Sequence, residues 1–276
     1  MSKSILLISD MAGYSKVAIS AMIPVLTHMK YDLHYMPTCL VSNNFDYGLF
    51  DILDTTQYVR NTMGVWNQLG FEFDAICTGF IVSDEQAELV TDYCRQKAES
   101  GCVIFTDPIM GDEGTLYNGV DPENVAAMRK LVAVADYIVP NYTEAAYLAD
   151  MPYHEQGTTK DELIQIIDKL REMGAGSVVI TSARLAGADL CSVVGYDAVA
   201  QDYFQIDYEE IPGRFPGTGD IFTSVFMGHI MHSIDMRTST ERAMDAVRNM
   251  IAHSLSSEED RRKGLPIELS LDVLDA

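Results

Sequence analysis

The chain has few basic residues and few cysteines, and it has no long apolar run. Of its 276 residues, 19 are Lys or Arg and 41 are Asp or Glu, which gives a formal net charge of −22. Nucleic acid and anionic membrane surfaces both need clustered Lys and Arg, so this balance argues against either partner. No apolar run has membrane-spanning length, and the N-terminus is predicted to be a first strand, not a signal peptide.

The five cysteines are scattered, and no Cys-x-x-Cys pair occurs. Several lie inside apolar, strand-like runs, which favours buried, reduced thiols in a cytoplasmic protein. The chain also has no internal repeat and no linker rich in Pro, Gly or Ser. With an apolar content of 47%, it is long enough to bury a sizeable core, and we expect one domain over residues 1–276.

Strand-like and helical runs alternate along the chain. Strands are predicted over residues 4–10, 33–42, 75–82, 102–108, 137–140 and 177–182, followed by a hairpin of 189–194 and 198–211 around Gly195-Tyr196-Asp197. Helices are predicted over residues 16–30, 55–69, 84–100, 122–135, 143–149, 159–174, 220–231 and about 240–254. This alternation predicts an α/β fold with a mostly parallel central sheet and helices on both faces.

The segment Phe215-Pro216-Gly217-Thr218-Gly219-Asp220 precedes a long apolar helical run. Glycines let successive N–H groups point in one direction, and a helix N-terminus adds unpaired donors and a positive dipole end. Together they predict a pocket for phosphate oxygens. Asp220 at its rim is placed to accept a proton from a substrate hydroxyl. The simpler alternative is a loop capped by an Asp.

Polar residues follow nearly every predicted strand. The residues at the strand exits are Ser9 and Asp10, then Ser42 to Asn44, Gly79 and Phe80, Asp107 with Gly111 and Asp112, Asn141 and Glu144, and Thr181 and Ser182. Each has a structural alternative when taken alone, such as a turn at Asp107 or a capping box of Asn141 and Glu144. Ligands of a parallel sheet bind outside the carboxyl ends of its strands, so the set as a whole predicts one binding site.

Four motifs carry a resemblance to a known family: Asp107-Pro108-Ile109-Met110-Gly111-Asp112, Pro140-Asn141-Tyr142-Thr143-Glu144, Val178-Val179-Ile180-Thr181-Ser182 and Gly217-Thr218-Gly219-Asp220. In their order and spacing the chain resembles ribokinase-superfamily kinases over nearly its whole length. Within that superfamily it is most similar to the pyridoxal kinases of vitamin B6 salvage. The stretch from Pro37 to Asn43, with Tyr47-Gly48 after it, is closer to this family than to the hydroxymethylpyrimidine kinases.

The resemblance implies ATP as the phosphoryl donor and Mg²⁺ as the metal cofactor. It leaves a monovalent-cation requirement open. Asp220 would be the catalytic base, and the amides of Gly217, Thr218 and Gly219 would bind the transferring phosphoryl group. Asp107 and Glu144 would organise the metal, together with Asp112 and Asn141. Thr181 and Ser182 would contact the phosphates, residues 111–117 would form a flap over them, and Ile211 and Phe215 would flank the adenine.

The acceptor side would be lined by Ser9, Asp10, Asn44, Phe45, Tyr47 and Phe80, and this side departs from the family pattern. Pyridoxal kinases commonly have a His-Thr pair where this chain has Asn44 and Phe45. They often have a tyrosine where it has Phe80, which lacks the hydroxyl. Asp10 stands where many members have histidine or aspartate. The nucleotide side keeps the family pattern.

The resemblance therefore implies a cytoplasmic homodimer that phosphorylates the hydroxymethyl group of a B6 vitamer. One alternative is a hydroxymethylpyrimidine kinase or another kinase of small alcohols such as sugars or nucleosides, which the changes at Asn44, Phe45 and Phe80 keep open. The other is a protein that binds a vitamer or a nucleotide without catalysis. Asp220, Asp107 and Glu144 speak against it.

Overall fold

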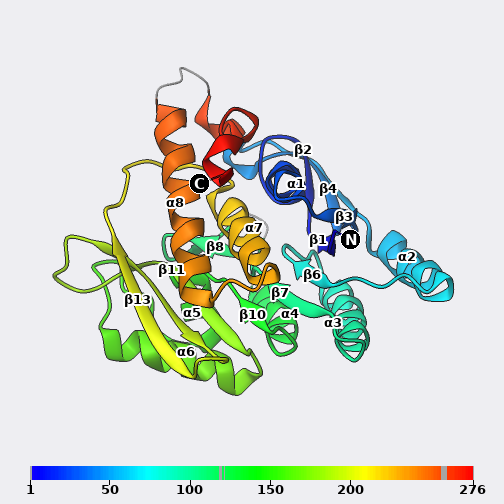
Figure 1. Cartoon of the computed structure of the whole chain (residues 1–276), viewed down its shortest axis with the longest axis horizontal. Helices are drawn as coiled ribbons and strands as arrows, with labels where there is room; N and C mark the ends of the chain where they lie inside the picture. Colours follow the sequence, from blue (N-terminus) through cyan, green and yellow to red (C-terminus); the bar gives the residue numbers. More distant parts are fainter. Residues whose placement is uncertain (1, 118–119, 121, 256–259, 276) are drawn as a thin grey trace. The chain divides into compact units, whose positions relative to one another are not determined.

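The computed structural model describes residues 2–117, 120, 122–255 and 260–275. Contacts between residues divide the chain into two compact units. Unit 1 comprises residues 1–79 and 211–276, and unit 2 comprises residues 80–210. Each unit combines parallel strands with helices (Figure 1), which confirms the predicted α/β class with a mostly parallel sheet.

Unit 1 is built around three parallel strands in the order β6-β1-β3, with β1 (Ser4–Ile8), β3 (Asp32–Tyr35) and β6 (Ala75–Thr78). Residues Ile5 to Ile8 of β1 are completely buried, because a central parallel strand is covered on both faces. Four helices belong to this unit: α1 (Ile19–His28), α2 (Thr56–Leu69), α7 (Thr218–Met231) and α8 (Met236–Leu255). Helix α7 packs against both α1 and α8.

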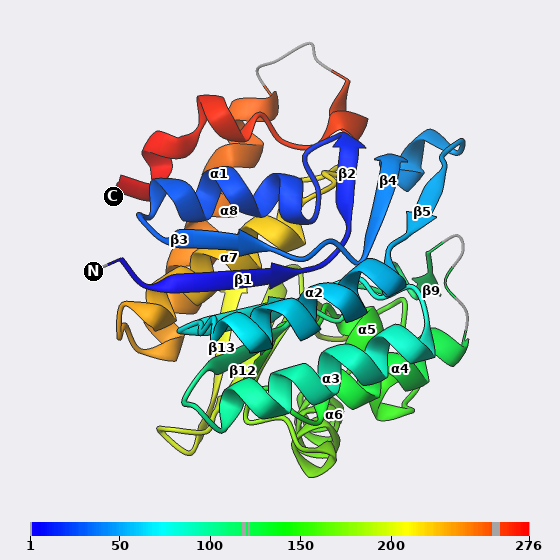
Figure 2. The same cartoon turned by 90° about the vertical axis from the view of Figure 1, so that its right-hand side faces the viewer.

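A second, smaller sheet in unit 1 contains β2 (Met11–Tyr14), β4 (Cys39–Asn43) and β5 (Ile52–Asp54), in the order β2-β4-β5 (Figure 2). The prediction of one strand over residues 33–42 is therefore wrong. The run divides at Met36-Pro37-Thr38, so β3 joins the main sheet and β4 joins the small one. Proline cannot donate to a strand ladder, which explains the division at Pro37. Strands β2 and β5 were not predicted.

Unit 2 contains five strands in the order β13-β12-β11-β10-β7. They are β7 (Val103–Thr106), β10 (Tyr137–Ile138), β11 (Ser177–Arg184), β12 (Cys191–Asp197) and β13 (Asp202–Tyr208). β7, β10 and β11 are parallel, while β12 and β13 are antiparallel additions. The predicted hairpin is present, but its turn lies at residues 198–201. Gly195, Tyr196 and Asp197 belong to β12 instead.

The helices of unit 2 are α3 (Asp84–Ala98), α4 (Pro122–Val132), α5 (Tyr142–Ala149) and α6 (Lys160–Met173). The eight α-helices in the described part of the chain were all predicted, with ends shifted by up to a few residues. The N-termini of α3, α5 and α6 begin at Ser83, Asn141 and Thr159, whose side chains each accept a hydrogen bond from the first turn. A short ribbon of β8 (Gly111–Asp112) and β9 (Thr115–Leu116) follows β7.

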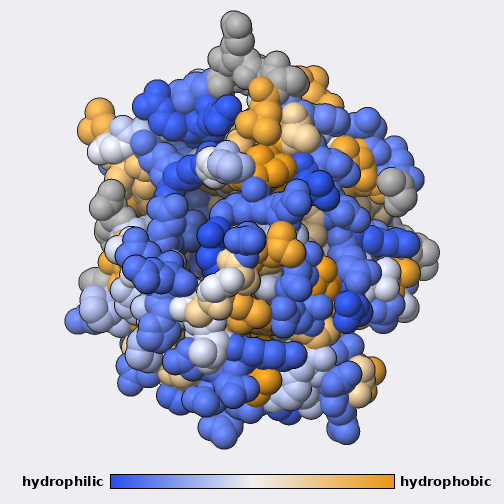
Figure 3. Space-filling model, turned by 90° about the vertical axis from the view of Figure 1, so that its left-hand side faces the viewer, coloured by the Kyte–Doolittle hydropathy of each residue, from blue (hydrophilic) through white to orange (hydrophobic). Residues whose placement is uncertain are grey.

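The face drawn in Figure 3 is largely hydrophilic, and its hydrophobic residues form separate small patches. Among the residues that the structure describes, no helix combines the length and the apolar character that crossing a membrane requires.

Candidate active site

The glycine loop begins α7, as predicted. Gly217 is its N-cap and has a φ of 87°, in the left-handed region. A Cβ atom at Gly217 would lie 2.2 Å from the carbonyl oxygen of Lys16, so the packing of unit 1 requires glycine here. At Gly219 an added Cβ would have no protein atom within 4 Å. The Cβ position of Gly219 therefore borders open space, while the Thr218 N–H donates to the Phe215 carbonyl at 3.4 Å.

Asp220 lies in the first turn of α7 and is 9% exposed. Its carbonyl oxygen accepts a hydrogen bond of 2.7 Å from Ser224 Oγ, inside the helix. Nearly all of the apolar residues of α7 are buried, which fixes the helix axis and with it the place of the carboxylate. A carboxylate at a helix N-terminus is stabilised by the helix dipole.

A buried carboxylate, Glu144, lies at the centre of the residues of unit 2 that were predicted for the phosphate side. Its Oε1 accepts from the Met110 N–H at 3.0 Å, and its Oε2 accepts from the Asn141 N–H at 2.9 Å. Asn141 Oδ1 accepts in return from the Glu144 N–H at 2.9 Å, which completes a capping box. The capping box and the predicted site are thus the same residues. The cap holds the carboxylate against the loop that follows β7.

Three carboxylates influence one another in this cluster. Burial, followed by the charge of Asp107 and then that of Asp112, raises the pKa of Glu144 well above its ordinary value, while its two backbone hydrogen bonds oppose the shift. Asp107, directly after β7, is 8% exposed. Repulsion of this kind is relieved by a cation, so the electrostatics favour a positively charged ligand.

The β8–β9 ribbon is fastened to the N-terminus of α5. Asn141 Nδ2 donates to the Gly111 carbonyl at 2.8 Å, and the Gly114 N–H donates to Thr143 Oγ1 at 2.9 Å. A Cβ atom at Gly111 would lie 2.3 Å from the Thr115 carbonyl oxygen, so the close approach of the two strands needs glycine. The ribbon occupies the segment predicted as a flap, residues 111–117.

Thr181 and Ser182 lie at an irregularity in β11. The register of β11 against β12 shifts between Ile180 and Ala183, and Ser182 has a φ of 57°. Thr181 remains bridged to Asn141, with its N–H donating to the Pro140 carbonyl at 2.9 Å. β-Bulges of this kind redirect side chains and are frequent next to active sites. Ser182 is exposed as a result.

The acceptor-side residues of unit 1 fall in two groups. Ser9 and Asp10 directly follow β1, and Ser9 Oγ donates to Asp10 Oδ1 at 3.3 Å. Burial raises the pKa of Asp10 to about 6. This carboxyl therefore changes its charge close to neutral pH, unlike an ordinary aspartate.

The second group lies in residues 44–48, which we call the acceptor loop. Asn44 caps the short helix η1 (Phe45–Tyr47) by accepting from the Asp46 N–H at 3.0 Å. The rings of Phe45 and Phe50 are 4.6 Å apart, centroid to centroid. Tyr47 donates its hydroxyl to Asp260 Oδ2 at 3.2 Å. The polar groups of Asn44 and Tyr47 thus bond to the protein itself.

The predicted adenine-side residues precede the glycine loop. Ile211 is partly exposed, and Phe215 is buried with the Arg261 guanidinium 5.5 Å from its ring centre. Phe80, predicted for the acceptor side, belongs to unit 2 and is buried there. Sequence reasoning missed Lys16, Arg214, Asp260 and Arg262, which surround the glycine and acceptor loops. The one available signal was the basic run Arg261-Arg262-Lys263 in a strongly acidic chain.

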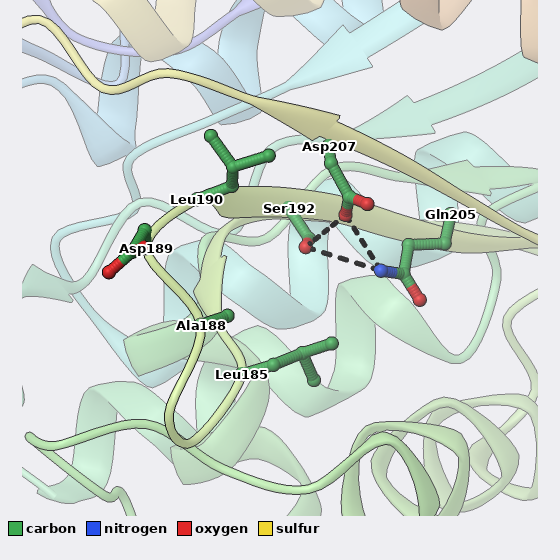
Figure 4. Close-up of a pocket in the computed structure, with 7 residues that line it drawn as sticks. All are labelled: Leu185, Ala188, Asp189, Leu190, Ser192, Gln205 and Asp207. Atoms are coloured by element: carbon green, nitrogen blue, oxygen red, sulfur yellow. Dashed lines mark hydrogen bonds between the residues drawn. The ribbon is translucent and has the colours of Figure 1, made fainter.

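Unit 2 also has a hollow that the sequence did not predict (Figure 4). It lies beside β12 and β13 and is lined by Leu185, Ala188, Asp189, Leu190, Ser192, Gln205 and Asp207. Asp207 Oδ1 accepts from Ser192 Oγ and from Gln205 Nε2, both at 2.7 Å, and these bonds lower its pKa. The polar groups of this hollow therefore satisfy one another.

Known proteins resemble this chain over nearly its full length. The model of the phosphomethylpyrimidine kinase family matches residues 10–263. Pyridoxal kinase PdxY of Corynebacterium diphtheriae is 28% identical over 273 residues, which cover 96% of this chain and 93% of that protein. The matched range includes all four motifs around Asp107, Asn141, Thr181 and Asp220.

Two solved structures extend the comparison. One is a Bacteroides thetaiotaomicron protein described as a phosphomethylpyrimidine kinase, in a crystal form with pyridoxal. It has 33% identity and a TM-score of 0.94, over 100% of this chain and 96% of that one. Pyridoxal kinase from Lactobacillus plantarum has 28% identity and a TM-score of 0.87, over 99% of this chain and 96% of that one.

Proposed function

Because the chain belongs to the phosphomethylpyrimidine kinase family, we propose that it transfers the γ-phosphoryl group of ATP to the hydroxymethyl group of pyridoxal or a related B6 vitamer. The proposal rests on the start of α7, where Asp220 directly follows Gly219, a glycine with open space at its Cβ position. The identity of the acceptor is inferred from proteins that are similar to this chain. The Corynebacterium and Lactobacillus proteins are pyridoxal kinases, and the Bacteroides protein was crystallised with pyridoxal.

Asp220 is the general base in this proposal. It accepts the proton of the substrate hydroxyl as that oxygen attacks the γ-phosphorus, and the bond from phosphorus to the bridging oxygen of ADP breaks. The amides of Gly217, Thr218 and Gly219 stabilise the charge on the transferring oxygens. The space beside Gly219 supports this role, because a Cβ atom there would fill it.

The carboxylates of unit 2 fit a magnesium ion. Magnesium prefers oxygen ligands, keeps several waters, and needs only one or two carboxylates. Asp107 and Glu144 would hold it, with Asp112 and Asn141 nearby, and bound metal would neutralise charge on the β- and γ-phosphates. The mutual repulsion at Glu144 supports this assignment. Among the described residues, no group of three or more His, Cys, Asp or Glu side chains is arranged to hold a metal ion directly.

The remaining sequence predictions complete the proposal. Thr181 and Ser182 contact the phosphates, Ile211 and Phe215 flank the adenine, and Ser9, Asp10 and Phe80 belong to the acceptor side. We propose one kinase domain over residues 1–276. We place the enzyme in the cytoplasm, where ATP and reduced cysteines are both found.

We also propose a homodimer, for which the small sheet of unit 1 offers a surface. Leu40 and Leu53 are paired across β4 and β5 and are 43% and 60% exposed, and Leu49 between them in the chain is 84% exposed. Apolar patches of this kind commonly mark protein interfaces. Replacing Leu40 and Leu53 with Glu should convert the dimer to a monomer in light scattering, and a monomeric parent protein would refute the proposal.

The second candidate is a kinase of hydroxymethylpyrimidine, and the family description favours it. One assay separates the candidates. ADP formation with Mg²⁺ is measured against pyridoxal, pyridoxine, pyridoxamine and hydroxymethylpyrimidine, with ribose and a nucleoside as controls. We expect the highest kcat/KM with a B6 vitamer. Preference for hydroxymethylpyrimidine would establish the second candidate, and binding of ATP without turnover on any acceptor would refute kinase function.

A further inference from the structure

A short segment near the C-terminus, residues 260–264, contacts both loops of the unit 1 site, and we call it the C-terminal clamp. It contains three consecutive cations, each placed over a different aromatic ring. Arg261 lies 5.5 Å from the ring centre of Phe215, Arg262 4.6 Å from that of Tyr47, and Lys263 5.8 Å from that of Tyr14. Three such contacts from adjacent residues join segments that are far apart in the sequence.

The clamp holds the acceptor loop by two polar bonds. Tyr47 donates to Asp260 Oδ2 at 3.2 Å, and Asn44 Nδ2 donates to the Arg262 carbonyl at 3.1 Å. The Arg262 guanidinium in turn donates to both oxygens of Asp260 at 3.0–3.2 Å. A planar fork on a carboxylate has a defined geometry, so this pair fixes the guanidinium over the Tyr47 ring.

The same clamp contacts the glycine loop through Lys16. The Lys16 N–H donates to the Lys263 carbonyl at 2.6 Å. A Cβ atom at Gly264 would lie 2.6 Å from the Lys16 carbonyl oxygen and 3.1 Å from that of Pro216, and one at Gly217 would lie 2.2 Å from the Lys16 oxygen. The backbone of Lys16 is therefore packed between the clamp and the N-cap of α7.

A third contact joins the acceptor loop to the segment just before the glycine loop. Arg214, just before the glycine loop, donates from Nε and from a terminal nitrogen to the two oxygens of Asp46, at 2.9 and 3.0 Å. Asp46 lies within η1, at the centre of the acceptor loop. The acceptor loop is thus fixed to the segment leading into Asp220 both directly and through the clamp.

We propose that the C-terminal clamp is a positioning element for acceptor recognition, with Asp260 and Arg262 as its positioning residues. They hold the acceptor loop in its binding conformation before the substrate arrives, which removes an ordering cost from binding. In this account the Tyr47 hydroxyl acts through Asp260 and not on the substrate. The inference rests on the proposed function in one respect, that the acceptor loop binds the small alcohol.

Because the C-terminal clamp is exposed, its effect on acceptor binding can be distinguished from an effect on the stability of the protein. The side chains of Arg262 and Asp260 are 55% and 39% exposed. Exposed ion pairs contribute little to the free energy of unfolding. Disrupting this pair should therefore change acceptor binding while the melting temperature stays nearly constant, a combination that a merely structural contact would not give.

The test compares Arg262→Ala with Arg237→Ala. Arg237 is a matched control because it lies on α8, pairs with Glu241 at 3.2 Å and is also 55% exposed. For Arg262→Ala we expect the KM for pyridoxal to rise about tenfold, with kcat and the KM for ATP within about twofold of the parent. Tyr47→Phe should raise the same KM by less, and Arg262→Lys should restore part of the loss because it keeps the charge but not the fork.

A second readout does not depend on activity. Hydrogen exchange of the full chain should show amides of residues 44–48 exchanging about tenfold faster in Arg262→Ala than in Arg237→Ala. An unchanged acceptor KM in an active Arg262→Ala enzyme overturns the proposal, and so does unchanged exchange at residues 44–48. A parent enzyme that leaves pyridoxal untouched refutes the proposed function instead, and exchange then decides whether the clamp orders the loop.

Discussion

The phosphate-side cluster of unit 2 and the acceptor loop of unit 1 are fixed in opposite ways. Glu144 is 3% exposed, and its carboxylate bonds to backbone groups 3 and 34 residues away. Asn44 and Tyr47 depend on residues 218 and 213 positions away, through a clamp whose ion pair faces solvent. The cluster around Glu144 is buried and held by partners 3 and 34 residues away, while the acceptor loop is held by exposed contacts more than 200 residues away in the sequence.

The two regions should differ in how much stability a substitution costs. A buried carboxylate among other carboxylates is costly to disturb, because a lost partner leaves polar groups without water. Exposed pairs can change at small cost in stability. We therefore expect substitutions in the cluster around Glu144 to affect catalysis strongly. Substitutions around the acceptor loop should instead shift acceptor preference.

The largest effect is expected at Asp220, the proposed general base. Asp220→Asn keeps the shape of the side chain but cannot accept the proton, so kcat should fall about a thousandfold or more. Nucleotide affinity, measured by calorimetry with ADP and Mg²⁺, should stay within about threefold, because the groups that hold phosphate remain. Turnover near the parent rate would remove Asp220 from its assigned role.

The second largest effect is expected at the two glycines of the loop before Asp220, Gly217 and Gly219. Gly219→Ala should leave the melting temperature unchanged or slightly higher, because no protein atom obstructs the new methyl group. Its kcat should fall about a hundredfold as the methyl group crowds the phosphoryl site. Gly217→Ala should instead destabilise the fold, through the 2.2 Å contact with Lys16 and the φ of 87°. Equal melting temperatures for the two variants would contradict this division.

A smaller effect is expected at Glu144, for which the chain supplies a matched control. Glu144 and Glu162 both complete capping boxes, at α5 and α6, but only Glu144 lies among other carboxylates. Glu144→Gln should raise the Mg²⁺ concentration for half-maximal turnover about tenfold, whereas Glu162→Gln should leave it unchanged. Identical magnesium dependence of the two variants would argue against a metal role for Glu144.

The smallest effect concerns Asp10 and the stability of unit 1. Its pKa of about 6 lies above the unfolded value of 3.8, so wild-type stability falls as pH rises from about 4 to 7. Asp10→Asn should therefore melt a few degrees higher than wild type at pH 7, and this advantage should vanish near pH 4. Melting curves across that range would check it. An advantage independent of pH would mean that the carboxyl is not destabilised by burial.

Much of the phosphate side could be read from the sequence, because its geometry depends on local patterns. Asn141 with Glu144, and Gly217 with Asp220, are short motifs at helix starts, and a helix start fixes where its capping side chains lie. The resemblance to ribokinase-superfamily kinases is confirmed by the family match, and the α/β class by the structure. The assigned roles of individual residues stay predictions.

The acceptor side could not be read in the same way, because long-range contacts fix it. Pro37 divides one predicted strand between two sheets, and the small sheet exists only once β2, β4 and β5 meet. Nothing local to Tyr47 indicates that Asp260 would accept its hydroxyl. The bulge at Ser182 likewise depends on the register between β11 and β12, which neither strand specifies alone.

Transfer of the γ-phosphoryl group from ATP to the acceptor alcohol can be tested by identifying the labelled products of the reaction. The parent enzyme and Asp220→Asn would be incubated with pyridoxal, Mg²⁺ and ATP labelled in its γ-phosphate, and the labelled products would be separated. We expect label in pyridoxal 5′-phosphate with the parent enzyme and almost none with the variant. Label found only in inorganic phosphate, or retained in ATP, would contradict it.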